Sequence, residues 1–268
     1  ALIYGNSATD GPDLVHQLDK DTGALIQNFS VSSGNGRGVA VVDGVIYSTE
    51  AGPGESIFGG SNQIYMTDLS TGWPLGSITV SGLPTGIALS TLAWDGSHFW
   101  ATEYLGTNHV FKIDTAGNVV KIIVLGLVVN DADGLEYFNG KLISNRGDGV
   151  GPYDVYDLDG NLLQAGFIDP ATVGVSFTTG IAFDGSDFYT SDLYGRLEIW
   201  NGVTGAHEGS LVLSGGSFNI EDLSFDYTKL AGIDIAESAL RPRNRQSSES
   251  LESFEVARAV IPPTKTPR

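Results

Sequence analysis

The sequence predicts an all-β protein built from a repeated unit of four antiparallel strands. Three observations lead to this prediction. Glycine accounts for 36 of the 268 residues, about twice its usual share, which indicates many tight turns and short strands. Apolar and polar residues alternate on both sides of Asp-Gly and Asn-Gly turns, a pattern typical of β-hairpins. One such hairpin recurs roughly every 45 residues, the spacing of a repeat architecture.

The recurring hairpin joins an apolar strand, a turn and a second apolar strand, as in IAFDGSDFYTSD. Its five copies span Val39–Glu50, Leu92–Glu103, Leu135–Arg146, Ile181–Asp192 and Leu223–Asp234. A second kind of hairpin alternates with the first along the chain. Its five copies span Leu14–Phe29, Gln63–Val80, His109–Val124, Tyr153–Phe167 and Arg196–Leu213. Four short strands at this period form the blade of a β-propeller, because a twisted sheet buries both faces only when blades pack around an axis.

The number of blades follows from counting each kind of strand. Second strands occur six times, because Ala1–Asn6 aligns with them, and third strands occur six times if Ser253–Arg258 is included. First and fourth strands occur five times. We therefore predict a six-bladed propeller whose first blade lacks its innermost strand and whose last blade lacks its outer strand. The alternative is a five-bladed ring, in which residues 220–227 complete the first blade and the chain beyond about residue 236 lies outside.

The chain divides into a propeller body, residues 1–236, and a C-terminal extension, residues 237–268. The extension is basic and contains Pro, and its alternating pattern predicts one strand over about residues 251–261, which Pro262 and Pro263 end. Residues 1–240 hold 8 Lys and Arg against 29 acidic residues, whereas residues 241–268 hold 6 against 3. The net charges are therefore −21 and +3. This separation is what an extension that docks onto an acidic surface would have.

Composition excludes several classes of function. The net charge of −18 argues against nucleic-acid binding. The chain has no Cys, which excludes disulfides and Cys-ligated metals, and no apolar run long enough to span a membrane. The sequence begins with Ala rather than Met, as removal of a signal peptide would leave it, and we expect a secreted, extracellular protein.

Polar residues close every second strand and should form a ring at one mouth of the central channel. This mouth column consists of Asn6, Glu50, Glu103, Arg146, Asp192 and Asp234. Carboxylates in a ring repel one another unless they bind a cation or basic groups. The four acids Glu50, Glu103, Asp192 and Asp234 are thus candidate ligands for a divalent cation, the single cofactor that the pattern suggests. The alternative, which we favour, is hydrogen bonding between blades.

No catalytic set is evident. The four histidines have no paired metal-binding spacing, and no serine lies in a G-x-S-x-G setting. Asp157–Asn161 has the spacing of a calcium loop, but the same position is a turn in the other units, and we interpret it as a turn. Aromatic residues on first and second strands should fill the core between blades; these are Trp94, Trp100, Tyr137, Phe183, Tyr189 and Phe225. Trp73 and Trp200 lie near second hairpins and could serve as surface platforms for sugars.

The repeat, with F-D-G-x-x-F-Y followed by I-x-x-x-D-x-x-G-x-x-L, resembles the superfamily of NHL, YVTN, SMP-30 gluconolactonase and streptogramin-lyase propellers over about residues 1–236. It also resembles exported bacterial propellers. Such a resemblance implies the propeller architecture rather than one activity. Gluconolactonase relatives would hold a metal with Glu, Asn and Asp at the channel, where only the mouth column could do so here, and its Arg146 departs from such a set. Streptogramin-lyase relatives would use histidine with Mg²⁺, and no matching histidine cluster occurs.

These observations favour a secreted, non-catalytic propeller that assembles with copies of itself into an extracellular filament or matrix, through strand donation or docking of the extension. The expected interface residues are Arg241, Arg243, Arg245, Phe254, Val256, Arg258 and Ile261. Two alternatives stay open. One is a metal-dependent hydrolase or lyase of the lactonase-like type, acting at the mouth column. The other is a propeller that binds a glycan or peptide through an exposed aromatic patch.

Overall fold

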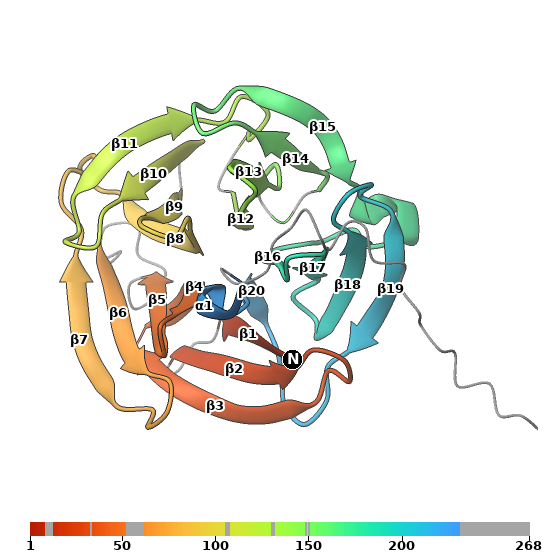
Figure 1. The fold of residues 1–268 in the computed structure, drawn as a ribbon, viewed down its shortest axis with the longest axis horizontal. Coiled ribbons are helices and arrows are strands. Elements are labelled where there is room, and N and C mark those ends of the chain that lie inside the picture. Colours follow the sequence, from red (N-terminus) through yellow and green to blue (C-terminus); the bar gives the residue numbers. More distant parts are fainter. Residues whose placement is uncertain are drawn as a thin grey trace, which may run out of the picture.

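The protein, seen here in a computed structural model, is a ring of five blades around a central axis (Figure 1). The structure describes residues 1–8, 13–32, 34–51, 62–104, 108–129, 132–147, 149 and 151–230. Each blade is an antiparallel sheet of four strands. Blade 1 contains β20, β1, β2 and β3, and blades 2 to 5 contain β4–β7, β8–β11, β12–β15 and β16–β19.

The innermost strands are β20 (Ile220–Ser224), β4 (Asn35–Val42), β8 (Ala88–Trp94), β12 (Leu135–Phe138) and β16 (Ile181–Phe183). The second strands are β1 (Leu2–Ser7), β5 (Val45–Ala51), β9 (Phe99–Tyr104), β13 (Lys141–Ser144) and β17 (Asp187–Ser191). The third strands are β2 (Asp13–Asp19), β6 (Gln63–Asp68), β10 (His109–Ile113), β14 (Tyr153–Tyr156) and β18 (Arg196–Asn201). The outer strands are β3 (Leu25–Ser32), β7 (Pro74–Thr79), β11 (Val119–Val124), β15 (Leu162–Ile168) and β19 (His207–Val212). A 3₁₀ turn, η1 (Pro170–Val173), and a single helical turn, α1 (Tyr227–Leu230), complete the described elements.

The prediction of six blades was wrong, and the five-bladed alternative is correct. Strand β20 pairs with β1 in antiparallel register, with Tyr4 opposite Ser224 and Gly5 opposite Leu223. It therefore supplies the innermost strand that the first blade lacked, instead of starting a sixth blade. Helix α1, Tyr227–Leu230, includes the first two residues of the further second strand that was expected over residues 229–234, and the rest of that strand lies outside the described residues. The two ends of the body meet in one sheet, so blade 1 is complete.

The turns between third and outer strands repeat one hydrogen-bonding device. In blade 4, Asp157 Oδ1 accepts from the backbone N–H of Asp159 and Asn161 at 2.9 Å each. The same role is played in blades 1, 2, 3 and 5 by Asp19, Asp68, Asp114 and Asn201. An acceptor side chain that bonds to backbone amides two to four residues ahead stabilises a turn locally. The interpretation of Asp157–Asn161 as a turn is therefore confirmed.

The hydrophobic core is divided into five clusters, each between neighbouring blades. Between blades 4 and 5, Phe138, Phe183 and Phe188 pack in edge and tilted arrangements with ring centroids 4.6 to 5.7 Å apart. Trp200 is 1 % exposed in the same cluster and donates to Thr190, so it is a core residue and no surface platform. Trp73, in contrast, is 72 % exposed.

Two glycines allow the innermost strands to approach closely near the axis. A Cβ added to Gly38 would lie 2.4 Å from the Ser90 carbonyl oxygen of blade 3. A Cβ added to Gly180 would lie 2.5 Å from Asp222 Cα in blade 1. Any side chain at these positions would force the blades apart.

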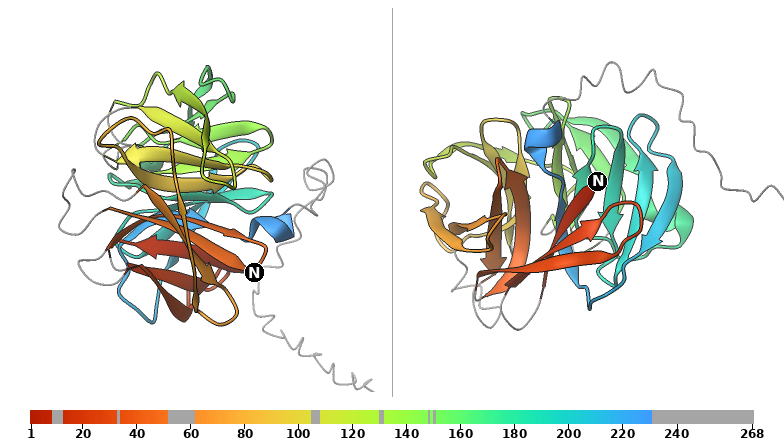
Figure 2. Two further views of the ribbon diagram at one scale, coloured as in Figure 1. Left: turned by 90° about the vertical axis from the view of Figure 1, so that its left-hand side faces the viewer. Right: turned by 60° about the horizontal axis from the view of Figure 1, so that its bottom comes forward.

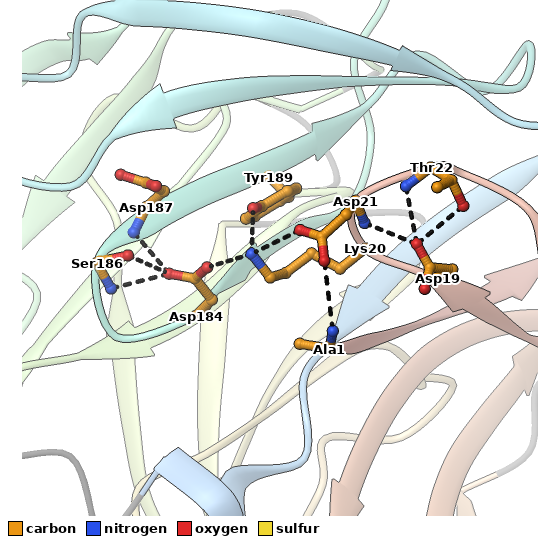
Figure 3. A network of polar contacts seen from close by, with 9 residues as sticks. All are labelled: Ala1, Asp19, Lys20, Asp21, Thr22, Asp184, Ser186, Asp187 and Tyr189. Atoms are coloured by element: carbon orange, nitrogen blue, oxygen red, sulfur yellow. Dashed lines mark hydrogen bonds and ion pairs between the residues drawn. The ribbon is translucent and has the colours of Figure 1, made fainter. Parts of the chain in front are cut away.

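Blade 1 is also tied to blade 5 by a polar network around Lys20 (Figure 3). Its ammonium donates to Tyr189 at 3.3 Å and lies 3.5 Å from the Asp184 carboxylate, both in blade 5. Asp21, in the same turn as Lys20, lies 3.4 Å from the ammonium. Burial opposes the charged form of Lys20, but Tyr189, Asp184 and Asp21 outweigh it and raise the pKa of Lys20. The network thus reinforces the junction where the ring closes.

The predicted C-terminal strand and the seven interface residues lie outside the described residues. Within the part of the chain that the structure describes, no helix is long and apolar enough to cross a membrane.

Candidate functional site

Buried acids occupy the axis because the innermost strands present backbone N–H groups there. Asp222 is fully buried, and its Oδ2 accepts from Val39 N in blade 2 and from Leu92 N in blade 3, at 3.0 Å each. One carboxylate of blade 1 therefore links three blades. Burial raises the pKa of Asp222 well above its usual value, although these amides partly oppose the shift.

Glu136, on β12, is the second buried acid of the axis. Its carboxylate accepts from Tyr227 OH and from Tyr137 N at 2.7 Å each, and from Phe183 N at 3.2 Å. Burial raises the pKa of Glu136 to about 8, against the opposing effect of these three donors. Glu136 thereby fastens together three residues from two blades and α1. All three line one pocket.

Residues of the turns between first and second strands and of α1 line one axial pocket. Figure 2 shows α1 at one end of the ring. The volume of the axial pocket is about 320 Å³, within the size range of small-molecule sites. The side chains of four blades and of α1 form its walls. They are Val42, Asp43, Trp94, Asp95, Tyr137, Phe138, Asn139, Phe183, Tyr227, Thr228 and Leu230, with Gly96 and Gly185.

The apolar walls come from one repeated position of the sequence. The residue that ends each first strand, directly before the turn, is Val42, Trp94, Phe138 or Phe183 in blades 2 to 5. Because first strands are innermost and run in the same direction along the axis, their last residues converge at one end. Burying a flat apolar body between such walls is the main source of affinity in small-molecule sites.

The polar lining of the axial pocket is acidic. Two carboxylates, Asp43 and Asp95, belong to the described lining, and no Lys or Arg does. Asp95 is paired with Lys112 at 2.9 Å and accepts from Trp100 at 3.0 Å, whereas exposed Asp43 accepts from Thr228 at 3.0 Å. Hydrogen bonding, above all to Lys112 and Trp100, outweighs burial and lowers the pKa of Asp95 to about 2. The pocket therefore combines aromatic walls with fixed negative charge.

Sequence reasoning assigned Trp94, Tyr137 and Phe183 to the core between blades, and Phe183 is buried there while Trp94 and Tyr137 pack against core clusters. It did not foresee that all three also line this pocket. Trp100, Tyr189 and Phe225 are buried between blades, as predicted. The signal that could have found the pocket is the apolar residue directly before each Asp-Gly or Asn-Gly turn, which is Val42 in blade 2 and aromatic in blades 3 to 5. Neighbouring blades cover the side chains along each first strand. The side chain that ends the strand lies at the end of the axis, where it lines the pocket.

The mouth column lies at the opposite ends of the second strands, and its members have partners of their own. Glu50 accepts from Gly34 N at 2.7 Å and from Tyr65 OH at 2.5 Å. Glu103 lies 3.3 Å from His109 Nδ1, and Asp192 Oδ1 accepts from Tyr194 N and Arg196 N. Arg146 pairs with Asp154 through two hydrogen bonds of 2.7 and 2.9 Å, and Asn6 donates to Gly38 O.

Asp234, the remaining member of the mouth column, lies outside the described residues. Among the residues that are described, no group of three or more His, Asp or Glu is placed to hold a metal ion. A metal held by Glu50, Glu103, Asp192 and Asp234 stays a prediction.

No family model matches the sequence, and no curated protein is similar to it in sequence. Among solved structures, the fold is similar to a glutaminyl cyclase of Myxococcus xanthus, with a TM-score of 0.50 and 16 % sequence identity. The match covers 66 % of this chain and 70 % of that chain. The expected membership of the NHL and SMP-30 superfamily is not confirmed by a family match. At this identity the likeness to an enzyme shows the propeller fold alone.

Proposed function

We propose that the protein is a ligand-binding propeller whose axial pocket takes a small organic molecule with an apolar, preferably aromatic, body and a positively charged group. The convergence of Trp94, Phe138 and Phe183 with Tyr227 on one pocket of about 320 Å³ carries this proposal. Aromatic walls bind a flat apolar body and attract cations to their faces. Asp43 at the rim adds a carboxylate that a cationic ligand can approach.

Binding rather than covalent chemistry is the function that the side chains support. The hydroxyl group of Tyr227 donates to Glu136, and that of Thr228 donates to Asp43. Both hydroxyls are thus held by carboxylates and shape the wall of the pocket. Glu136 is 1 % exposed, so it acts through Tyr137, Phe183 and Tyr227 as a positioning residue.

Three probes of similar shape test the proposal: tryptamine, indole and indole-3-acetate, which are cationic, neutral and anionic at neutral pH. We expect tryptamine to bind most tightly and indole-3-acetate most weakly in calorimetric titrations of the full chain. D43N should reduce the preference for tryptamine over indole, because it removes the rim charge without changing the shape of the side chain. Equal affinities for the three probes would refute the charge preference. Affinities unchanged by Trp94→Ala would refute the pocket itself.

A second candidate function is self-assembly through the C-terminal extension, in a secreted filament or matrix. One observation favours docking of the extension at the axial pocket. Leu230, the last described residue before the extension, lines the acidic pocket, and residues 241–268 carry a net charge of +3. Strand donation into an incomplete blade has lost its basis, because all five blades have four strands.

Light scattering on the full chain and on a chain lacking residues 241–268 tests this second function. Assembly requires the full chain to be larger than a monomer and the truncated chain to be monomeric. If both chains have the same size, the extension does not drive assembly. A truncated chain that binds tryptamine more tightly than the full chain would show that the extension covers the pocket of its own molecule.

A further inference from the structure

Two buried oxygen atoms near the start of blade 1 face the same point and lack a hydrogen-bond donor. They are Oδ1 of Asn6, on β1, and Oδ1 of Asp13, at the start of β2. Both residues are 0 % exposed. Leaving a buried carboxylate oxygen and a buried amide oxygen without partners is costly, so such a pair calls for an explanation.

The remaining polar atoms of both residues fix these orientations. Asn6 Nδ2 donates to Gly38 O at 2.9 Å, so a flip of the amide group would lose a hydrogen bond. Asp13 Oδ2 accepts from Ser32 Oγ at 3.1 Å. The free oxygens therefore both point toward Gly36 on β4, where an added Cβ would lie 2.0 Å from Asp13 Oδ1 and 2.3 Å from Asn6 Oδ1. Only a glycine leaves room for the two oxygens at this point.

Among the described residues, Asp13 forms no ion pair, and its hydrogen-bonding neighbours are the neutral side chains of Ser32 and Asn6. Arg37, on β4, is the nearby cation, but its guanidinium pairs with Glu221 at 3.0 Å and donates to Tyr104 at 2.9 Å. Glu50, on β5, adds a further negative charge near Asp13, and both of its oxygens are engaged by Gly34 and Tyr65. This end of the axis therefore carries buried negative charge in excess of its basic groups.

We propose that Asp13 Oδ1 and Asn6 Oδ1 are ligands of a bound Ca²⁺ ion between blades 1 and 2. A carboxylate and an amide carbonyl are the oxygen donors that this hard cation prefers. Asn35 Oδ1 is a third buried acceptor without a partner, on the residue that precedes Gly36. This calcium site is distinct from the predicted set of Glu50, Glu103, Asp192 and Asp234, because neither of its two ligands belongs to that set.

The test adds Ca²⁺ to the chelator-treated full chain and measures the melting temperature and the heat of binding. We expect Ca²⁺ to raise the melting temperature of the wild type by several degrees at concentrations about 100-fold above its dissociation constant. D13N should abolish this shift, and N6D should strengthen calcium binding by roughly tenfold or more, because it adds a carboxylate to the site. D192N is the matched control, since it removes an acid of the mouth column and should leave the shift unchanged.

The proposal is wrong if Ca²⁺ produces neither heat nor a melting shift in the wild type and in N6D. It is also wrong if the shift survives in D13N or disappears in D192N, since the ion would then bind elsewhere. A D13N chain that is more stable than the metal-free wild type, with no calcium response in any variant, would show that a proton shared by Asp13 and Asn6 satisfies the pair. Because N6D tests the site by gain of affinity, the proposal can be refuted even if D13N fails to fold.

Discussion

The two ends of the propeller axis differ in chemistry although they are built from the same repeated strands. At the end near α1, the last residues of the first strands are Val42, Trp94, Phe138 and Phe183, and they enclose an apolar pocket. At the other end, the second strands end with polar residues such as Glu103, and Arg37 lies near the start of the first strand β4; both side chains are buried among partners. The residues at the two ends of an axial strand lie at opposite ends of the axis. Two positions of the same repeat therefore determine two different surfaces.

Asp222 and Glu136 lie between these two ends, and each carboxylate joins neighbouring blades. Their carboxylates satisfy backbone N–H groups of blades 2, 3, 4 and 5. The comparison therefore separates residues that maintain the axis from residues that form its two ends. Substitutions of the two kinds should therefore have separable effects.

Asp222→Ala should have the largest effect on stability. It leaves Val39 N and Leu92 N buried without an acceptor, and each unsatisfied amide costs about 1–3 kcal/mol. We expect a loss of about 3–5 kcal/mol in the free energy of unfolding, measured in urea. The loss should destabilise both ends of the axis to a similar extent. Asp192→Ala, in an open turn, should cost less than about 1 kcal/mol. Similar losses in both variants would mean that Asp222 does not link the blades.

Glu136→Gln should change how stability depends on pH. The pKa of Glu136 is raised to about 8 in the folded chain, above its value of about 4.3 in the unfolded chain, so the folded state binds the extra proton between these values. The contribution of this proton to stability is therefore complete below about pH 4 and is lost as the pH rises to about 8. In E136Q, the decline in unfolding free energy between pH 5 and pH 8 should be smaller by roughly 2–4 kcal/mol. Parallel pH profiles for wild type and E136Q would contradict the raised pKa.

Trp94→Ala should affect the pocket end alone. It removes one aromatic wall, and we expect tryptamine binding to weaken by about 1–2 kcal/mol, or roughly tenfold, with the calcium response at the other end unchanged. Trp73→Ala is the matched control, because Trp73 is 72 % exposed in an outer turn. If the two variants bind tryptamine equally, the pocket assignment fails.

Arg37→Lys should have the smallest effect, confined to the opposite end. Lysine keeps the charge that pairs with Glu221 but loses the stacking on Tyr104, whose ring centroid lies 4.2 Å from the Arg37 guanidinium carbon. We expect a loss of about 1 kcal/mol in unfolding free energy and no change in tryptamine affinity. A change in tryptamine affinity would show that the two ends are coupled.

Part of the fold could be read from local patterns. The turn at Asp157 and the core positions of Trp100, Tyr189 and Phe225 follow from hairpin spacing and alternation, which depend on residues close in the chain. The axial pocket could not be read in this way, because Trp94, Phe183 and Tyr227 meet only when three separate parts of the chain are brought to one axis. The burial of Asp13 and Asn6 against Gly36 is likewise a contact between blades.

The amino-acid sequence by itself determined the four-stranded unit, its turns and the all-β propeller class, since alternation and turn residues act over a few positions. Tertiary structure decided the number of blades. Strands β20 and β1 lie more than two hundred residues apart, and by local pattern alone β20 could equally well begin a sixth blade as pair with β1. Ring closure selects the pairing that leaves every described blade with four strands. It also decided which side chains meet on the axis, and hence where ligands can bind.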